Sequence, residues 1–328
     1  MEENKNKKNN FSDFYSNKIL GKELLIATIL LIIFFSLSSD AFMSWRNISN
    51  ILRVLSITGV LTLGFSLIMI GGDFDLSIGS LIGLINIVGL ILMDKGVSLW
   101  LAFLVMILIG VAWELINAML VVKIKIHAFV ASLAMWQIAR GIIYWITGGR
   151  TIYGDYPEVL SFINQKTIGI VPVSTIIFII AAVIIYLLAN KSKFGRHLYA
   201  IGSNEKAAEY VGIDSEKRRI ISYAILGVLA GIGGIMLASK LTSGPATGGE
   251  SYQMAVIGSV FLGATAFKPG EINIGGSVLA VVIMAIIENG LVMFGAPFYF
   301  KYSVQGLIIL AAVSFVSFSS DESGPELF

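Results

Sequence analysis

Residues 98–122 read SLWLAFLVMILIGVAWELINAMLVV, and Glu114 is the only charged residue in this run. A helix over these positions is therefore apolar on almost every side. About 20 consecutive apolar residues are enough for a helix to cross the hydrocarbon core of a bilayer. A strand of a membrane barrel would instead alternate apolar and polar residues, and this run does not. It predicts a transmembrane helix.

The composition extends this prediction to the whole chain. Of its 328 residues, 56% are hydrophobic and 13% are charged, whereas soluble domains average about 45–50% apolar and about 25% charged. These values exclude a disordered chain, a collagen-like fibre and an ordinary soluble enzyme. Apolar windows lie at 24–37, 51–70, 76–93, 98–122, 128–147, 172–190, 220–239, 252–267, 274–294 and 302–318. We therefore expect an all-α polytopic membrane protein with about ten transmembrane helices.

The distribution of Lys and Arg predicts the orientation, because cytoplasmic loops of membrane proteins are enriched in these residues. The longest polar loop, 191–219, carries seven Lys and Arg against four Asp and Glu. The tail at 1–23 is also rich in Lys and Asn. With ten spans both termini are cytoplasmic. The predicted parts are a tail at 1–23, a membrane domain at 24–318 that includes the cytoplasmic loop, and a tail at 319–328.

Several residue counts argue against chemistry within this chain. It has no Cys, and its two histidines, His127 and His197, lie far apart, so we expect no metal site and no catalytic residue. No phosphate-binding loop is present, because Gly21 and Lys22 are followed by Glu23 and lack the upstream glycine. A net charge of +2 argues against binding of nucleic acid.

The loop at 194–213, FGRHLYAIGSNEKAAEYVGI, predicts a short helix outside the membrane. Asn204 is a good N-cap, and Glu205 in the first turn is favoured by the helix dipole. Gly212 can end the helix in a left-handed conformation. The pair of alanines gives the helix a small-residue face that could insert into a groove on a soluble partner. The alternative is an ordinary surface helix that needs no partner.

The pattern at 202–213 resembles the coupling-helix motif of ABC-importer permeases, and more closely that of the ribose/galactose/xylose-type permease family. Similar stretches occur at 71–79 (GGDFDLSIG), 116–121 (INAMLV) and 129–133 (FVASL). The resemblance covers about residues 40–318. The chain departs from the family pattern at 253–276. The resemblance assigns ATPase coupling to Gly202, Asn204, Glu205, Ala207, Ala208 and Gly212.

The resemblance also implies a function and a set of partners. It implies the membrane subunit of a bacterial importer for a monosaccharide or a similar polyhydroxylated solute, located in the cytoplasmic membrane. Such permeases work with a second permease subunit, identical or different, in the lipid bilayer. They receive solute from an extracytoplasmic binding protein. Two cytoplasmic ATPase subunits hold the ATP and Mg, so the chain itself is expected to bind no cofactor and to have no ATPase site. A charge introduced at Ala208 should then block uptake without unfolding the chain.

Ionisable groups within apolar spans are costly and indicate function by default. Asp73 and Asp75 precede a helix that should begin near residue 76, where Asp75 and Ser77 can cap it. Capping is the favoured role for them, and gating or solute contact is the alternative. A proton-coupled secondary transporter, using Asp73, Glu114 or Glu288, is the competing function.

Two further pairs could line a path. Glu114 and Asn117 share one helix face, as do Gln137 and Arg140 on the next helix. Either Glu114 and Arg140 form a buried ion pair, or both face the translocation path. The polar neighbours at 288–289, Glu288 and Asn289, interrupt an apolar span and are candidates for contact with solute hydroxyls.

Overall fold

The computed structural model describes residues 23–169, 171–297 and 299–320. The predicted cytoplasmic tails at 1–23 and 319–328 fall almost wholly outside these residues, so their location stays a prediction. The described chain is helical apart from loops and one pair of two-residue antiparallel strands, β1 (Thr167–Ile168) and β2 (Val171–Pro172). The all-α class is confirmed. The helices are α2 (Glu23–Ser38), α3 (Trp45–Ile70), α4 (Ile78–Asp94), α5 (Leu99–Ala118), the π-helical turn η1 (Met119–Lys123), α6 (Ala128–Thr147), α7 (Glu158–Gln165), α8 (Val173–Lys191), α9 (Lys193–Ser203), α10 (Glu205–Tyr210), α11 (Ser215–Leu241), α12 (Glu250–Gly263), α13 (Ile274–Met293) and α14 (Phe300–Ser320).

Each of the ten apolar windows falls on a helix, but the helices differ in length. Six are long and apolar enough to cross a membrane: α3, α5 continued by η1, α6, α8, α11 and α13. Helices α2 and α4 and the part of α14 up to Ser314 are apolar but shorter. With 14 residues, α12 is also shorter than a full span. The protein is therefore a multi-pass membrane protein.

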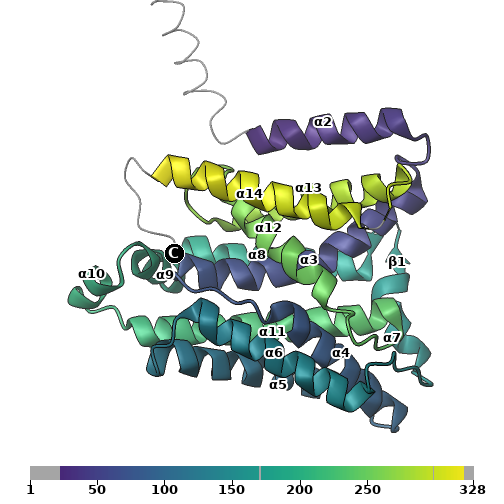
Figure 1. Ribbon diagram of the computed structural model, residues 1–328, viewed down its shortest axis with the longest axis horizontal. Coiled ribbons are helices and arrows are strands. Elements are labelled where there is room, and N and C mark those ends of the chain that lie inside the picture. Colours follow the sequence, from purple (N-terminus) through teal and green to yellow (C-terminus); the bar gives the residue numbers. More distant parts are fainter. Residues whose placement is uncertain (1–22, 170, 298, 321–328) are drawn as a thin grey trace, which may run out of the picture.

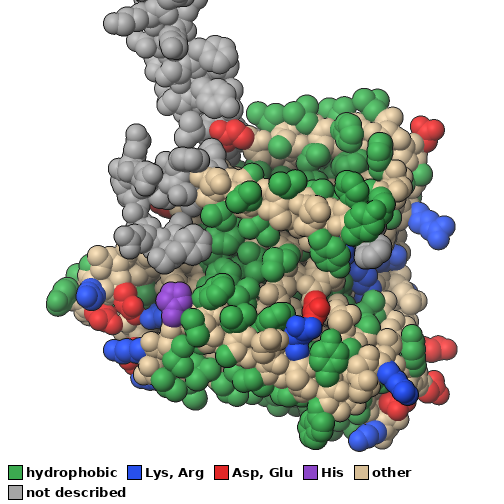
Figure 2. Space-filling model, viewed as in Figure 1, with side chains coloured by type: hydrophobic (Ala, Val, Ile, Leu, Met, Phe, Trp, Pro, Cys, Tyr) green, Lys and Arg blue, Asp and Glu red, His purple; other side chains and the backbone are tan. Residues whose placement is uncertain are grey.

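The helices lie roughly side by side, so the bundle has two distinct ends (Figure 1). Helices α9 and α10 lie at one end, called the α10 end below. Helix α7 and strand β1 lie at the other, called the α7 end. Charged side chains gather mainly at these ends, and hydrophobic side chains cover much of the face between them (Figure 2). This is the distribution that a lipid environment requires.

Glycines let the central helices approach closely. A Cβ atom added to Gly227 of α11 would lie 2.6 Å from the carbonyl oxygen of Gly110 in α5, closer than real contacts allow. The neighbouring Gly231 packs in the same way against Ile107. The Gly-x-x-x-Gly spacing at 227–231 therefore serves helix packing, as small residues do in membrane proteins.

The segment that links α11 to α12 enters the bundle instead of remaining at its surface. Gly244 exchanges two backbone hydrogen bonds with Ile152, in the loop after α6 at the α7 end. Five residues later, Gly249 lies against the backbone of α4 between Gly79 and Gly83. Helix α4 ends beside the loop at the α7 end, where Asp94 accepts from the backbone N–H of Asp155, so its first turns, against which Gly249 packs, lie well inside the bundle. Helix α12 therefore starts at membrane depth, a feature that the apolar window at 252–267 did not reveal.

Candidate functional site

The short helix predicted after Asn204 is present as α10. The Asn204 side chain accepts a hydrogen bond from the backbone N–H of Ala207 at 2.9 Å, as an N-cap does. The helix ends at Tyr210, and Gly212 follows with φ +83°, a conformation that favours glycine. Both local predictions are confirmed.

The two alanines of α10 face opposite surroundings. Ala207 is exposed, whereas Ala208 is 4% exposed and packs against the protein itself. Burial of Ala208 changes the expectation for a charge at this position: we now predict that it disturbs folding. The apolar groups that α10 presents to solvent are instead Tyr210, 91% exposed, and the adjacent Val211, 77% exposed.

Helix α9 is fixed against the end of α3. A Cβ atom on Gly202 would lie 2.0 Å from the carbonyl oxygen of Ile70, so only glycine allows this contact. The same glycine lies next to Gly72 in the turn that follows α3. Gly202 therefore holds the α9–α10 pair against the turn at 71–77, which carries Asp73.

Arg219, in the first turns of α11, links α10 to this turn. Its Nε and Nη2 atoms donate to the two carboxylate oxygens of Asp73 at 2.9 and 2.6 Å. Its Nη1 atom donates to Glu205, the first residue of α10, at 2.8 Å. The Asp73 side chain is 1% exposed and that of Glu205 is 44% exposed. One guanidinium group thus joins a surface helix to a buried turn.

Burial raises the pKa of the Asp73 carboxyl, and the hydrogen bonds and charge of Arg219 oppose that rise. Sequence patterns point to Asp73 and Glu205 but not to Arg219. In the sequence, Arg219 follows Lys217 and Arg218, and nothing distinguishes it from these two basic neighbours.

Helix α4 starts at Ile78, close to the predicted residue 76, and Ser77 is its N-cap residue. The predicted side-chain capping is wrong, because no side chain makes a capping hydrogen bond at this helix start. The Asp75 carboxylate accepts from the backbone N–H of Ser77 at 2.6 Å. The Ser77 hydroxyl oxygen accepts from Asn117 at 3.1 Å and from Trp113 at 3.3 Å. These contacts hold the turn at 71–77 against α5.

The Glu114 carboxyl is completely buried near that of Asp75, and neither of its oxygens has a hydrogen-bond partner within the described chain. The proposed ion pair of Glu114 with Arg140 does not form. Arg140 instead contacts Glu250, the first residue of α12, at 2.9 Å, and both side chains are about one-third exposed. Gln137, one turn before Arg140, is exposed on α6.

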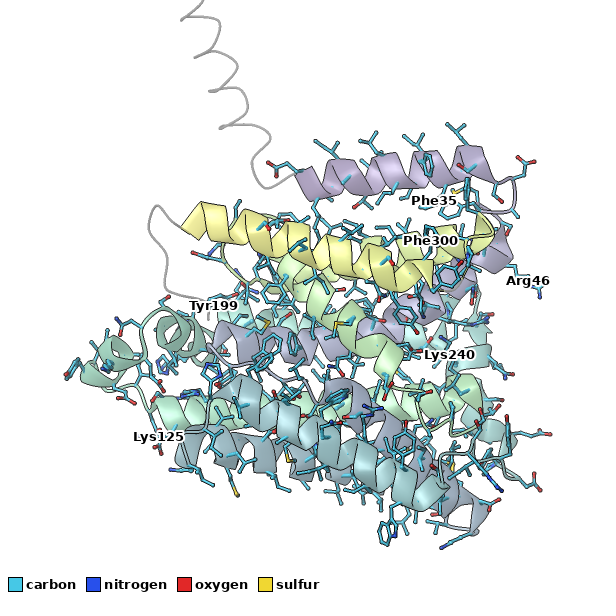
Figure 3. All side chains as sticks on the ribbon, viewed as in Figure 1. Phe35, Arg46, Lys125, Tyr199, Lys240 and Phe300 are labelled. Atoms are coloured by element: carbon cyan, nitrogen blue, oxygen red, sulfur yellow. The ribbon has the colours of Figure 1, made fainter. Side chains whose placement is uncertain are left out.

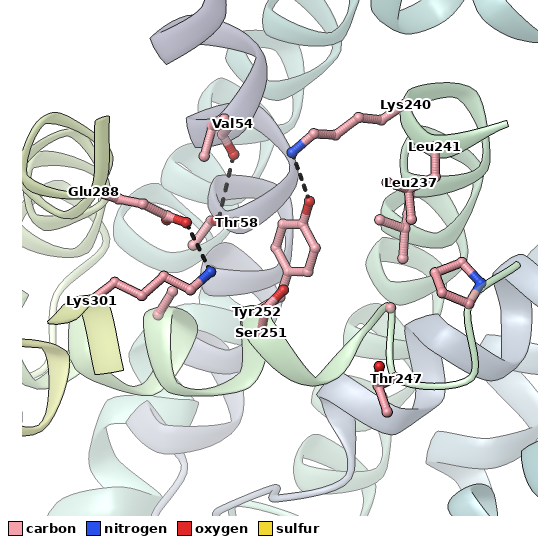
Figure 4. A pocket seen from close by; sticks show the side chains of 13 residues that line it. Val54, Thr58, Leu237, Lys240, Leu241, Thr247, Ser251, Tyr252, Glu288 and Lys301 are labelled. Carbon is pink, nitrogen blue, oxygen red and sulfur yellow. Dashed lines mark hydrogen bonds and ion pairs between the residues drawn. The ribbon is translucent and has the colours of Figure 1, made fainter. Parts of the chain in front are cut away.

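Two cavities lie toward the two ends of the bundle. The inner cavity, at the α10 end, has a volume of about 770 Å³ and is lined by Asp73, Glu205 and Arg219, among others. The outer pocket, toward the α7 end, has a volume of about 250 Å³ (Figure 4). Figure 3 shows Lys125, which lines the inner cavity, and Lys240, which lines the outer pocket, far apart along the bundle.

Helix α12 contributes to both cavities. Ala255 lines the outer pocket and Phe261 the inner cavity. Six residues separate them, which is about 9 Å of helix. Within this interval Val256 and Val260 are fully buried. A buried stretch of α12, residues 256–260, thus lies between the residues that line the two cavities.

The two residues at 288–289 have different surroundings. Glu288 lines the outer pocket and contacts Lys301 at 3.2 Å. The Asn289 side chain instead exchanges two hydrogen bonds of 2.9 Å with that of Asn47 and so ties α13 to α3. In the pocket, sequence reasoning missed Lys240, Tyr252 and Lys301, which lie on different helices.

A family model described as the branched-chain amino acid transport system / permease component matches residues 47–313. The chain belongs to this family. The ribose import permease protein RbsC of Bacillus subtilis (strain 168) is 34% identical over 291 residues, which cover 88% of this chain and 90% of the relative. The D-allose transport system permease protein AlsC of Escherichia coli (strain K12) is 33% identical, with 88% of this chain and 89% of the relative covered.

The L-arabinose transport system permease protein AraH of Escherichia coli (strain K12) is 30% identical, with 89% of each chain covered. No solved structure matches the chain. The resemblance that the motifs at 71–79 and 202–213 indicated is confirmed. The protein is a transport permease, and it is a multi-pass protein of the bacterial cytoplasmic membrane.

Proposed function

We propose that the chain is the permease subunit of a binding-protein-dependent ABC importer for a monosaccharide or a similar polyhydroxylated solute. Membership of the permease family and the ribose, allose and arabinose relatives support this proposal. In it, α10 lies on the cytoplasmic side. All ten apolar helices lie within the membrane region, with both termini in the cytoplasm.

The proposal includes partners that supply what this chain lacks. An extracytoplasmic binding protein delivers the solute at the α7 end. Cytoplasmic ATPase subunits, which hold ATP and Mg, bind the exposed side chains of Tyr210, at the end of α10, and of the adjacent Val211. A second permease subunit, identical or different, completes the assembly in the bilayer.

One observation carries the proposal: the Glu205–Arg219–Asp73 link connects α10 with the wall of the inner cavity. When the ATPase subunits close on ATP, they displace α10. Because Arg219 holds both Glu205 and Asp73, the displacement reaches the turn at 71–77. That turn is packed on α5 through Ser77 and Asn117, so the movement changes the access to the inner cavity.

The test is uptake of radiolabelled ribose, D-allose and L-arabinose by proteoliposomes that contain the permease, its ATPase and its binding protein. The wild-type complex should accumulate at least one of these sugars with ATP. Tyr210→Asp should release the ATPase subunits and abolish uptake. Tyr153→Asp is the matched control, because Tyr153 is 76% exposed but lies in the loop at the α7 end. Retention of the ATPase by Tyr210→Asp would contradict the docking role.

The buried Asp75–Glu114 pair is the one feature that favours the competing function, an ion-coupled secondary transporter. The two functions differ in their energy source. Uptake that stops without ATP and continues with an uncoupler supports the importer. Uptake that continues without ATP and stops with the uncoupler supports the secondary transporter.

A further inference from the structure

The outer pocket is built from five helices that the sequence separates widely. Its lining includes Thr58 of α3, Lys240 of α11, Tyr252 of α12, Glu288 of α13 and Lys301 of α14. Figure 4 shows the two lysine side chains reaching toward the pocket from opposite sides, with the Tyr252 ring between them. The arrangement is a concave site with polar groups that converge on one volume.

The lining offers hydrogen-bond donors and acceptors together. Lys301 Nζ lies 3.2 Å from Glu288 Oε1. The opposite charges of this pair cancel, and it can both donate hydrogen bonds to a solute through Lys301 and accept them through Glu288. Lys240 Nζ donates to the Tyr252 hydroxyl oxygen at 3.1 Å, and no carboxylate of the described chain lies within salt-bridge distance of this ammonium group. Hydroxyl groups of Thr247 and Ser251 complete the lining. A solute that carries many hydroxyl groups can satisfy such a mixture, whereas an apolar solute would leave it unpaired.

The backbone around the pocket is interrupted at membrane depth. Pro245, Thr247 and Gly248 belong to the non-helical segment at 242–249 that enters the bundle. Irregular backbone is tolerated at this depth only where it is buried in protein or lines a water-filled cavity. The irregular segment at 242–249 therefore fits the wall of a polar cavity.

The size and position of the pocket limit what it can hold. A volume of about 250 Å³ is below the ~300–1,000 Å³ of sites for drug-sized ligands and suits one monosaccharide. Along α12, the pocket lies on the α7 side of the buried stretch at 256–260, and the inner cavity lies on the other side. A solute in the pocket has therefore left the binding protein but has not crossed the barrier.

We propose that the outer pocket is a solute subsite, in which Lys240, Tyr252 and the Glu288–Lys301 pair hold one neutral monosaccharide before the barrier opens. The inference rests on the proposed function, because it takes the α7 end as the side from which solute arrives. In this proposal the permease itself distinguishes one solute from another through these side chains, in addition to any selection by the binding protein.

The first test uses the absence of Cys from the natural chain. In proteoliposomes, Ser251→Cys should react with a membrane-impermeant maleimide added at the side that receives the binding protein. Val313→Cys, whose residue lines the inner cavity, should not react from that side. The transported sugar, chosen from ribose, D-allose and L-arabinose by uptake, should slow the labelling of Ser251→Cys. Labelling at an unchanged rate with saturating sugar would overturn the subsite.

The second test measures sugar transported per ATP hydrolysed. Lys240→Met should lower this ratio by about tenfold, the effect of losing one hydrogen bond from a charged donor, and Lys240→Arg should restore most of it. Lys95→Met is the control, because Lys95 is exposed at the same end and outside the pocket. An unchanged ratio in Lys240→Met would contradict the inference. If the wild-type complex transports none of the three sugars with ATP, the proposed function fails instead.

Discussion

Replacement of Arg219 by Met should separate the structural cost of losing the Asp73 contact from its role in coupling. The Asp73 side chain is 1% exposed, and Arg219 donates two hydrogen bonds to it. Removing one partner of a buried ion pair leaves an unpaired charge and costs about 3–5 kcal/mol. Protonation of Asp73 limits this cost, because neutralising an ordinary Asp at pH 7 takes about 4 kcal/mol. We therefore expect a loss of ~3–4 kcal/mol at pH 7.

The pH dependence follows from the same reasoning. In Arg219→Met, burial raises the pKa of Asp73 in the folded state above its value in the unfolded state. A group with a raised folded pKa binds more protons in the folded state, so stability is lost as the pH rises. The deficit relative to the wild type should shrink as the pH is lowered from 7, because Arg219 no longer opposes the rise that burial causes in the pKa of Asp73. Unfolding in detergent, followed by circular dichroism, measures both quantities.

The double variant Asp73→Asn/Arg219→Met is the decisive comparison. It removes the buried charge, so it should recover most of the lost stability. It does not restore the contact between Glu205 and the turn at 71–77, so uptake should stay low while the ATPase subunits remain bound. If Arg219→Met is as stable as the wild type at pH 7, the buried pair described above is wrong. Normal uptake by the double variant would refute the coupling role.

Three further substitutions test packing. Ala208→Asp should lower the free energy of unfolding by about 3 kcal/mol or more, because it buries an unpaired charge. Ala207→Asp should leave it nearly unchanged in the same measurement, because Ala207 is exposed. Equal stability of the two variants would contradict the orientation of α10. Gly110→Val should lower the free energy of unfolding by ~1–3 kcal/mol or prevent insertion into the membrane, because a Cβ atom at this position would lie 2.3 Å from the carbonyl oxygen of Gly227. Gly306→Val is the control and should insert normally, because a Cβ atom there has no neighbouring atom within 4 Å. Asn289→Ala should lower the free energy of unfolding by ~1–3 kcal/mol. The double variant Asn47→Ala/Asn289→Ala should be little less stable than the single one, because the two side chains hydrogen-bond each other. Additive losses would contradict that contact.

Local features could be predicted from the sequence because their causes lie within a few residues. The helix window at 98–122 needs only its own apolar run. Asn204 and Gly212 act on the backbone of the helix that they flank, so their residue types indicate where α10 begins and ends. Asp75 likewise acts on its own neighbourhood, where its carboxylate accepts from the backbone N–H of Ser77 in the turn before α4.

Contacts between distant segments could not be predicted in this way. Asp73 and Arg219 lie 146 positions apart, and a basic run at 217–219 gives no sign of which member turns inward. The sequence favours an ion pair between Arg140 and Glu114 because these residues lie on two successive apolar helices. The partner of Arg140 is Glu250 because the segment at 242–249 enters the bundle, and an apolar window does not show at what depth its helix starts.

The central claim is that movement of α10 reaches the inner cavity through Arg219 and Asp73. The most direct measurement is the labelling rate of Val313→Cys by a maleimide from the α10 side, with and without ATP, in the reconstituted complex. ATP should change this rate in the otherwise natural chain, and it should leave the rate unchanged when Asp73→Asn/Arg219→Met is added. An equal response to ATP in both backgrounds would contradict the claim.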